Sequence, residues 1–157
     1  MSETLGKKAE SKIREWLNRP EEGYCFYRIP DQLGGYSGPQ GSNPCDFLLY
    51  KYPYLYWIES KATEHDRFDF SMITDFQRES LLKYSAIDGV KGLVIVLFAT
   101  YQRAFVFDIV DIQELSSKGT KSLNIKKIDK WNIEYQEIPT VPSRKQILDY
   151  DKNSNIF

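Results

Sequence analysis

The chain has 157 residues, of which 41% are hydrophobic and 15% aromatic, and its 21 basic and 22 acidic side chains give a formal net charge of −1. This length and composition are typical of one globular domain with a substantial hydrophobic core, and they exclude a disordered tail or a linker. The nearly balanced charge excludes nucleic-acid binding by overall electrostatic attraction. An anionic partner would have to meet a local basic patch.

The two cysteines, Cys25 and Cys45, are too few for a disulfide framework and are expected to be reduced thiols. The N-terminus lacks the apolar segment of a secretion signal, and no apolar run approaches the roughly 18 residues that a membrane span needs. We therefore expect a cytoplasmic protein.

The first part of the chain is predicted to form one helix and then three strands. Ser2 or Thr4 is a suitable N-cap for a helix that ends near Asn18. Strands are expected over 25–29, 46–50 and 54–59, and the short 51–53 connection indicates that the last two form an antiparallel hairpin. Four glycines and three prolines between residues 30 and 44 predict a long irregular loop.

In the second part, Thr74 or Asp75 is expected to cap a helix that runs to about Ile87. The continuous apolar run 93–99 predicts a central strand that is covered on both faces, and 104–109 predicts another strand. A helical turn is expected over 111–115, an edge strand over 131–138, and frayed residues over 149–157. This order predicts one α/β domain over 1–157, with its core at about 3–115 and C-terminal additions over 116–157.

Charged residues at the ends of the predicted hairpin strands indicate a site. Because side chains alternate along a strand, Glu59 and Lys61 share one face with Trp57. The hairpin places Asp46, at the start of the preceding strand, opposite the end of the strand that carries Glu59. Two nearby carboxylates repel each other unless a cation lies between them, and Mg²⁺ or Mn²⁺ with oxygen ligands is the usual solution. Lys61 is then placed to orient a water molecule or to stabilise a phosphoryl transition state.

The segment Pro44-Cys45-Asp46, followed after twelve residues by Glu59-Ser60-Lys61, resembles the PD-(D/E)xK motif of the restriction-endonuclease-like nucleases. The resemblance implies an αβββαβ core with a mixed central sheet flanked by helices. It also implies a Mg²⁺-dependent DNA endonuclease, for which Mn²⁺ can substitute. Asp46, Glu59 and the carbonyl of Ser60 would hold the metal, and Lys61 would position the attacking water, leaving a 5′-phosphate and a 3′-hydroxyl.

Flanking residues narrow the resemblance. Glu10 lies in a G-x-x-x-E pattern on the first helix, and Gln77 lies on the helix after the motif. Together with Phe68-Asp-Phe-Ser-Met72 they are similar to RecU-type Holliday-junction resolvases, which are dimeric nucleases of DNA recombination and repair. This implies catalytic roles for Glu10 and Gln77, a homodimer, and branched DNA as substrate. The basic stalk that precedes the catalytic Asp in that family is replaced here by residues 20–45, a shorter Gly/Pro-containing segment in which Arg28 is the only basic residue, so junction specificity is open.

Each assignment has a simpler alternative. Strand ends often carry solvated charges, a Glu on a lysine-rich helix has structural uses, and a single loop histidine is usually solvated. With these alternatives open, Lys7, Lys12, His65 and Arg67 are candidates for contacts to DNA phosphates. The alternative functions are another nuclease of the same superfamily, of the restriction or repair type, and an inactive DNA-binding module on the same fold.

Overall fold

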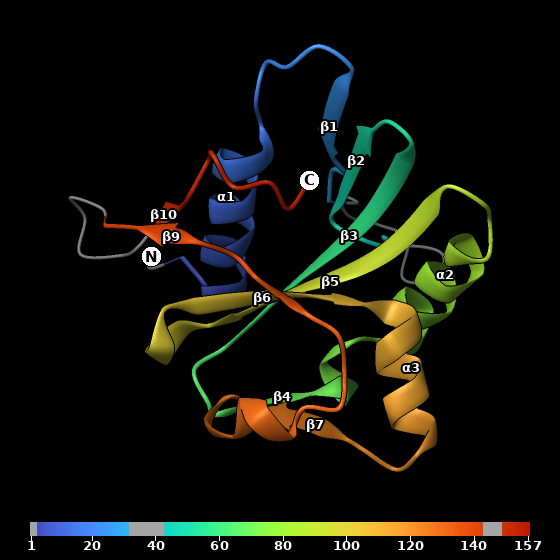
Figure 1. Cartoon of the computed structure of the whole chain (residues 1–157), viewed down its shortest axis with the longest axis vertical. Helices are drawn as coiled ribbons and strands as arrows, with labels where there is room; N and C mark the ends of the chain where they lie inside the picture. The colour runs from blue at the N-terminus through green and yellow to red at the C-terminus, as the bar shows by residue number, and fades with distance from the viewer. Residues whose placement is uncertain (1–2, 32–42, 143–148) are drawn as a thin grey trace.

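The structure, a computed structural model, describes residues 3–31, 43–142 and 149–157. Its centre is a six-stranded sheet in the order β1-β2-β3-β5-β6-β8 (Figure 1). The strands are β1 (Tyr24–Arg28), β2 (Phe47–Lys51), β3 (Tyr54–Thr63), β5 (Val90–Phe98), β6 (Arg103–Asp108) and β8 (Gln136–Glu137). Only β3 and β5 pair in parallel within this sheet; the other neighbours are antiparallel. The predicted mixed sheet and the αβββαβ order of a restriction-endonuclease-like core are confirmed.

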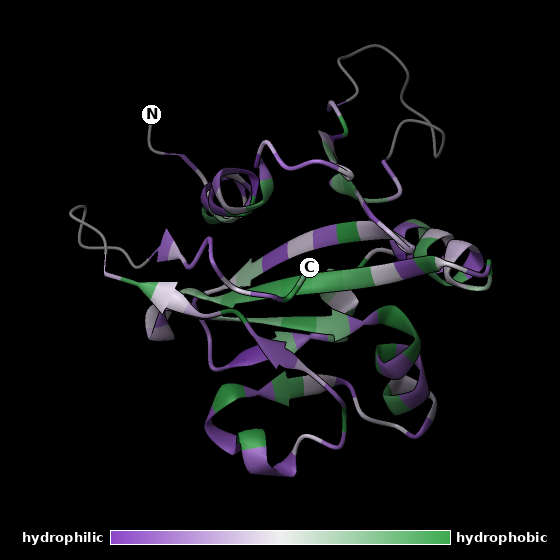
Figure 2. Cartoon of the chain, turned by 45° about the horizontal axis from the view of Figure 1, so that its top comes forward, coloured by the Kyte–Doolittle hydropathy of each residue, from purple (hydrophilic) through white to green (hydrophobic). Residues whose placement is uncertain are grey.

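Within the described ranges, three α-helices cover the two faces of the sheet: α1 (Leu5–Leu17), α2 (Asp75–Ser85) and α3 (Ile109–Ser117). Helix α1 packs on one face against β3, while α2 and α3 lie on the other face against β5 (Figure 1). Figure 2 shows that β5 and β6 are largely hydrophobic, as expected for strands that are covered on both faces, whereas β3 is mixed. No helix in the described ranges has both the length and the apolar content that a membrane crossing requires.

The helix starts follow from side chains that cap them. Thr4 caps α1, with its hydroxyl accepting from the backbone N–H of Lys7, whereas the alternative cap Ser2 lies outside the described residues. Thr74 caps α2 in a capping box with Gln77. Asp108 caps α3 by accepting from the N–H of Val110, so this helix begins earlier and runs longer than the turn predicted from the sequence.

A second, two-stranded sheet forms from two short segments in which the sequence predicted no strand. β4 (Arg67–Asp69) pairs antiparallel with β7 (Ser122–Asn124), and 3₁₀ turns follow each strand at Phe70–Met72 and Ile125–Lys130. A further 3₁₀ turn, Ala99–Tyr101, separates β5 from β6. The prediction failed because each strand has three residues, too few for a periodic pattern, and is held by the burial of Phe68 and Leu123 under the main sheet.

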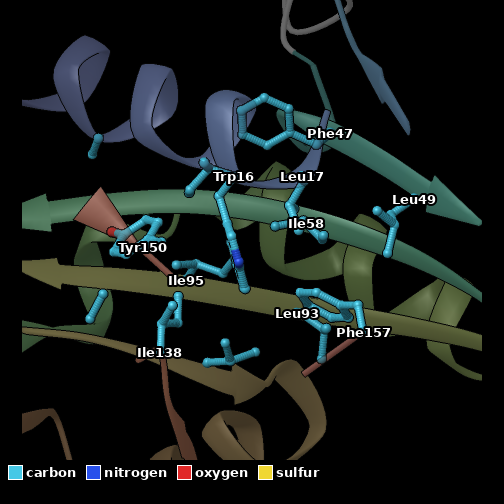
Figure 3. Packing of buried hydrophobic residues seen from close by; sticks show 14 of the residues in the cluster. Trp16, Leu17, Phe47, Leu49, Ile58, Leu93, Ile95, Ile138, Tyr150 and Phe157 are labelled. Carbon is cyan, nitrogen blue, oxygen red and sulfur yellow. The ribbon is translucent and has the colours of Figure 1, made fainter. Parts of the chain in front are cut away.

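The C-terminal residues are not frayed, so that expectation was wrong. β10 (Asp149–Tyr150) pairs with β9 (Thr140–Val141), and the side chains of Tyr150 and Phe157 are buried against Trp16 of α1 (Figure 3). These aromatic side chains remove enough apolar surface from water to hold an otherwise polar segment. The predicted edge strand is also shorter than expected, because only residues 136–137 pair with β6.

Gly92 permits a close approach between β5 and the helices α2 and α3. A Cβ atom at this position would lie 2.7 Å from the Ser85 hydroxyl and 2.9 Å from a methyl group of Ile109. The backbone N–H of Gly92 also donates to the Ser85 hydroxyl over 2.8 Å. Helix α2 is therefore held close to β5 at its C-terminal end.

Candidate active site

The β2–β3 hairpin brings Asp46 beside the end of β3 that carries Glu59. The register pairs Phe47 with Ile58, and the backbone N–H of Asp46 donates to the carbonyl of Ile58 over 3.0 Å. The carboxylate of Asp46 turns toward β3, where Oδ2 accepts from the backbone N–H of Ser60 over 2.7 Å. The predicted juxtaposition is thus produced by local strand pairing.

Glu59, Lys61 and Gln77 form one hydrogen-bonded network. The ammonium Nζ of Lys61 lies 2.8 Å from Oε1 of Glu59, in side chains that are 15% and 3% exposed respectively. Gln77 donates from Nε2 to the same Glu59 oxygen over 2.7 Å and accepts from Lys61 Nζ at Oε1 over 3.1 Å. Each of the three side chains contacts the other two, so their relative orientation is fixed.

The three side chains meet because one side of α2 packs against one face of β3. On α2, Gln77, Leu81 and Tyr84 lie at the spacing of a single helix face. Leu81 is fully buried, and the ring of Tyr84 stacks on Trp57 of β3 with centroids 4.2 Å apart. Since side chains alternate along β3, the face that presents Trp57 also presents Glu59 and Lys61. The stacked rings of Tyr84 and Trp57 therefore fix where along β3 the side chain of Gln77 contacts Glu59 and Lys61.

Burial raises the pKa of both carboxyl groups, because it disfavours their charged forms. It raises the pKa of Glu59 from 4.5 to about 8, and the negative charge of Asp46 contributes in the same direction against the lowering effect of Lys61. Burial also raises the pKa of Asp46 from 3.8 to about 6, although the Ser60 N–H opposes it. A cation between the two carboxyl groups would offset this cost.

The donor atoms suit a hard divalent cation. The second oxygen of Glu59, Oε2, is buried and has no hydrogen-bond partner, and an unpaired buried carboxylate oxygen is costly unless an ion or water satisfies it. In the part of the chain that the structure describes, no three His, Cys, Asp or Glu side chains are grouped as a metal cage. Mg²⁺ does not need one, because it commonly uses one or two carboxylates with waters and phosphate oxygens.

Glu10 lies beside this site but is held by Arg28. Oε2 of Glu10 is 3.2 Å from Nη2 of Arg28, which also lies 3.1 Å from Oδ1 of Asp31. The charges of Glu10 and Arg28 both act on the pKa of Asp46, with opposite signs. Glu10, Arg28 and the exposed Lys7 line a cavity of about 260 Å³. The carboxylate of Glu10 therefore belongs to the rim of the site.

The other residues considered for DNA contacts are in different situations. His65 and Arg67 are exposed on the segment that follows β3, with the backbone N–H of His65 bonded to the Thr63 hydroxyl. Lys12 instead faces the C-terminal strand, where its ammonium lies 3.6 Å from Oδ1 of Asp149. His65 thus follows directly after β3 and Arg67 begins β4 (Arg67–Asp69), while Lys12 is engaged with another part of the molecule.

Two residues with contacts at the site, Arg28 and Thr74, were not predicted from the sequence to be site residues. Arg28 was visible only as the single basic residue near the Gly/Pro loop, and its pairing with Glu10 depends on how β1 packs near α1. Thr74 was predicted only as one of two candidate helix caps, the other being Asp75. The signal that identifies its second role is Gln77 three residues later, which is the spacing of a capping box.

Comparisons with known proteins place the chain in a family. The model of the family described as RecU, recombination protein U, matches residues 42–151, more than two thirds of the chain. Among solved structures, Hjc from Archaeoglobus fulgidus, a Holliday junction resolvase, matches with a TM-score of 0.45 and 17% identity, covering 67% of this chain and 78% of that chain. A comparison with curated protein sequences finds no match. The matched range contains Asp46, Glu59, Lys61 and Gln77, and the chain belongs to the RecU family.

Proposed function

We propose that this protein is a divalent-metal-dependent endonuclease that cuts branched DNA, with four-way junctions as its preferred substrate. The observation that supports the proposal is the buried carboxylate of Glu59 beside Asp46. Its Oε1 accepts from Lys61 and Gln77, whereas its Oε2 has no hydrogen-bond partner. Membership of a recombination family supports DNA as the substrate.

In this proposal each residue has a defined role. Asp46, Glu59 and the carbonyl of Ser60 hold Mg²⁺ or Mn²⁺. When bound, the cation supplies Lewis acidity toward a phosphate oxygen and lowers the pKa of a water molecule. Lys61 uses two of its three N–H donors on Glu59 and Gln77, and the third orients the attacking water or the phosphate. Gln77 holds the side chains of Lys61 and Glu59 in their relative positions.

Two outer groups complete the proposed site. Glu10 contributes negative charge at its rim, and Lys7, His65 and Arg67 contact DNA phosphates beside it. A cut in both strands of a junction needs two sites, so we propose a homodimer. Sedimentation of the protein alone and with a junction tests this part separately.

The test of the site is cleavage of a labelled four-way junction with Mg²⁺ or Mn²⁺, comparing wild type with Asp46→Asn. The matched control is Asp88→Asn, a change of the same kind at an exposed position after α2. We expect Asp46→Asn to lose cleavage and Asp88→Asn to retain it. Equal activity of wild type and Asp46→Asn would exclude the assigned site.

A second experiment tests the substrate class. Linear duplex, nicked, flap and four-way DNA of the same sequence are compared at equal concentrations. Preferential cleavage of the four-way DNA supports the junction proposal. Equal cleavage of linear duplex indicates a nuclease of the restriction or repair type, and tight binding without cleavage in either metal indicates a binding module.

A further inference from the structure

Gln77 uses its whole side-chain amide to join a helix end to the active site. Its Nε2 donates to Oε1 of Glu59 over 2.7 Å. Its Oε1 accepts from Lys61 Nζ and from the backbone N–H of Thr74, each over 3.1 Å. The amide has one allowed orientation, because a flipped amide would point its NH₂ group at two other donors.

Thr74 is the second anchor of Gln77. The Thr74 hydroxyl accepts from the backbone N–H of Gln77 over 3.2 Å, which completes the capping box of α2. In a usual capping box the N3 side chain serves only the helix end. Here the same side-chain oxygen serves both the helix end and Lys61, so the cap and the active site share an acceptor.

We propose that Thr74 is a positioning residue for the active site and acts through Gln77; this inference rests on the proposed nuclease function. Without the Thr74 hydroxyl the first turn of α2 loosens, and Gln77 no longer holds Oε1 of Glu59. The unpartnered Oε2 of Glu59 then loses its fixed direction, and Lys61 loses an acceptor. Because the Glu59 side chain is 3% exposed, solvent cannot readily replace the lost donor.

The structure offers a matched control at another helix start. Asp108 caps α3 by accepting from the Val110 N–H over 2.9 Å, and it contacts none of the site residues. Thr74→Ala and Asp108→Ala both remove an N-cap and are expected to lower stability alike. Thr74→Ser keeps the hydroxyl and restores the cap. Urea unfolding of each variant verifies that all are folded under the assay conditions.

The first readout is Mn²⁺ binding to the DNA-free protein by calorimetry. Removing a group that orients a metal ligand commonly weakens metal binding by 10-fold or more, so we expect a loss of about 10-fold for Thr74→Ala. Thr74→Ser should bind like wild type, and so should Asp108→Ala. If Asp108→Ala weakens binding as much as Thr74→Ala, the effect is one of general stability and the proposal is overturned.

The second readout is junction cleavage in the single and double variants. Thr74→Ala should lower kcat with little change in KM. In a Gln77→Ala background it should cause no further loss, because Thr74 acts through that side chain. Losses that multiply in the double variant would overturn the proposal. If wild type binds Mn²⁺ but cuts no DNA, the nuclease function is refuted, and the Mn²⁺-binding comparison still decides the role of Thr74. If wild type binds no Mn²⁺, the proposed function and the proposed role of Thr74 are both overturned.

Discussion

The raised pKa of Glu59 predicts that the metal-free protein loses stability as the pH rises. A carboxyl whose pKa is higher in the folded state than in the unfolded state binds its proton more tightly when folded. Its contribution to stability is therefore fully present below the unfolded pKa of 4.5 and is lost as the pH approaches the folded pKa of about 8. This direction is opposite to that of an exposed, ion-paired glutamate.

The magnitude follows from the two pKa values. At 1.36 kcal/mol for each pH unit between 4.5 and 8, ionisation of Glu59 in the folded state costs up to about 5 kcal/mol. No discount for solvent screening applies, since only 3% of the side chain is exposed. Asp46 adds a loss of the same sign, but in the lower window between pH 3.8 and about 6. Above pH 6.5 the remaining slope belongs mainly to Glu59.

The perturbation is Glu59→Gln, which keeps an acceptor for Lys61 and Gln77 and cannot ionise. Urea unfolding in EDTA at several pH values between 5 and 8.5 gives the free energy of unfolding of both proteins. We expect the difference in favour of the variant to grow by about 1.4 kcal/mol for each pH unit until it levels off near pH 8. Added Mn²⁺ should stabilise wild type at high pH and leave the variant unchanged.

Glu114→Gln is the matched control, because Glu114 is exposed and its pKa is lowered by Lys118. A lowered pKa removes stability only as the pH falls, so this variant should follow wild type across the whole range. The reasoning on Glu59 is refuted if the difference between wild type and Glu59→Gln does not change with pH. That result would mean that the ion pair with Lys61 outweighs burial and keeps Glu59 charged throughout.

Three further predictions address the chemistry and the packing. Lys61→Met should lower the cleavage rate by roughly 100-fold or more while Mn²⁺ binding persists, and loss of metal binding instead would assign Lys61 a structural role. Gly92→Ala should lower the free energy of unfolding by about 1–3 kcal/mol, because its methyl group meets the Ser85 hydroxyl. Gly6→Ala, on open helix surface, should stabilise by up to about 1 kcal/mol, and equal effects at both glycines would contradict the packing argument. Phe157→Ala should cost about 3 kcal/mol or more in urea unfolding, whereas an unchanged midpoint would show that the C-terminus does not contribute to the core.

Much of the site was accessible from the sequence because its main contacts are local. The alternation of a strand places Glu59 and Lys61 on one face, and the short connection before Tyr54 brings Asp46 to the same end of the hairpin. Hydrophobic runs also predicted β5 and β6 as strands, since both are buried over most of their length. The roles of the site residues stay predictions until the variants are measured.

Other features depend on contacts between distant segments. The pairing of β4 with β7 joins residues more than 50 positions apart and has no periodic signal in either segment. The Glu10–Arg28 ion pair arises from the packing of β1 near α1. The burial of Tyr150 and Phe157 against Trp16 was missed for the same reason. None of these contacts can be predicted from the local sequence pattern around the residues that make them.

The sequence by itself determined the hairpin, the shared face of Glu59 and Lys61, and a helix cap at Thr74 or Asp75, because backbone geometry and hydrogen bonds over a few residues suffice for each. Only the tertiary structure decided that Gln77 connects this cap to the two charged groups and that Glu59 is buried enough to have its pKa raised to about 8. Burial and dielectric environment are properties of the packed chain as a whole, so the chemistry of a carboxyl group depends on neighbours that its own sequence segment does not contain.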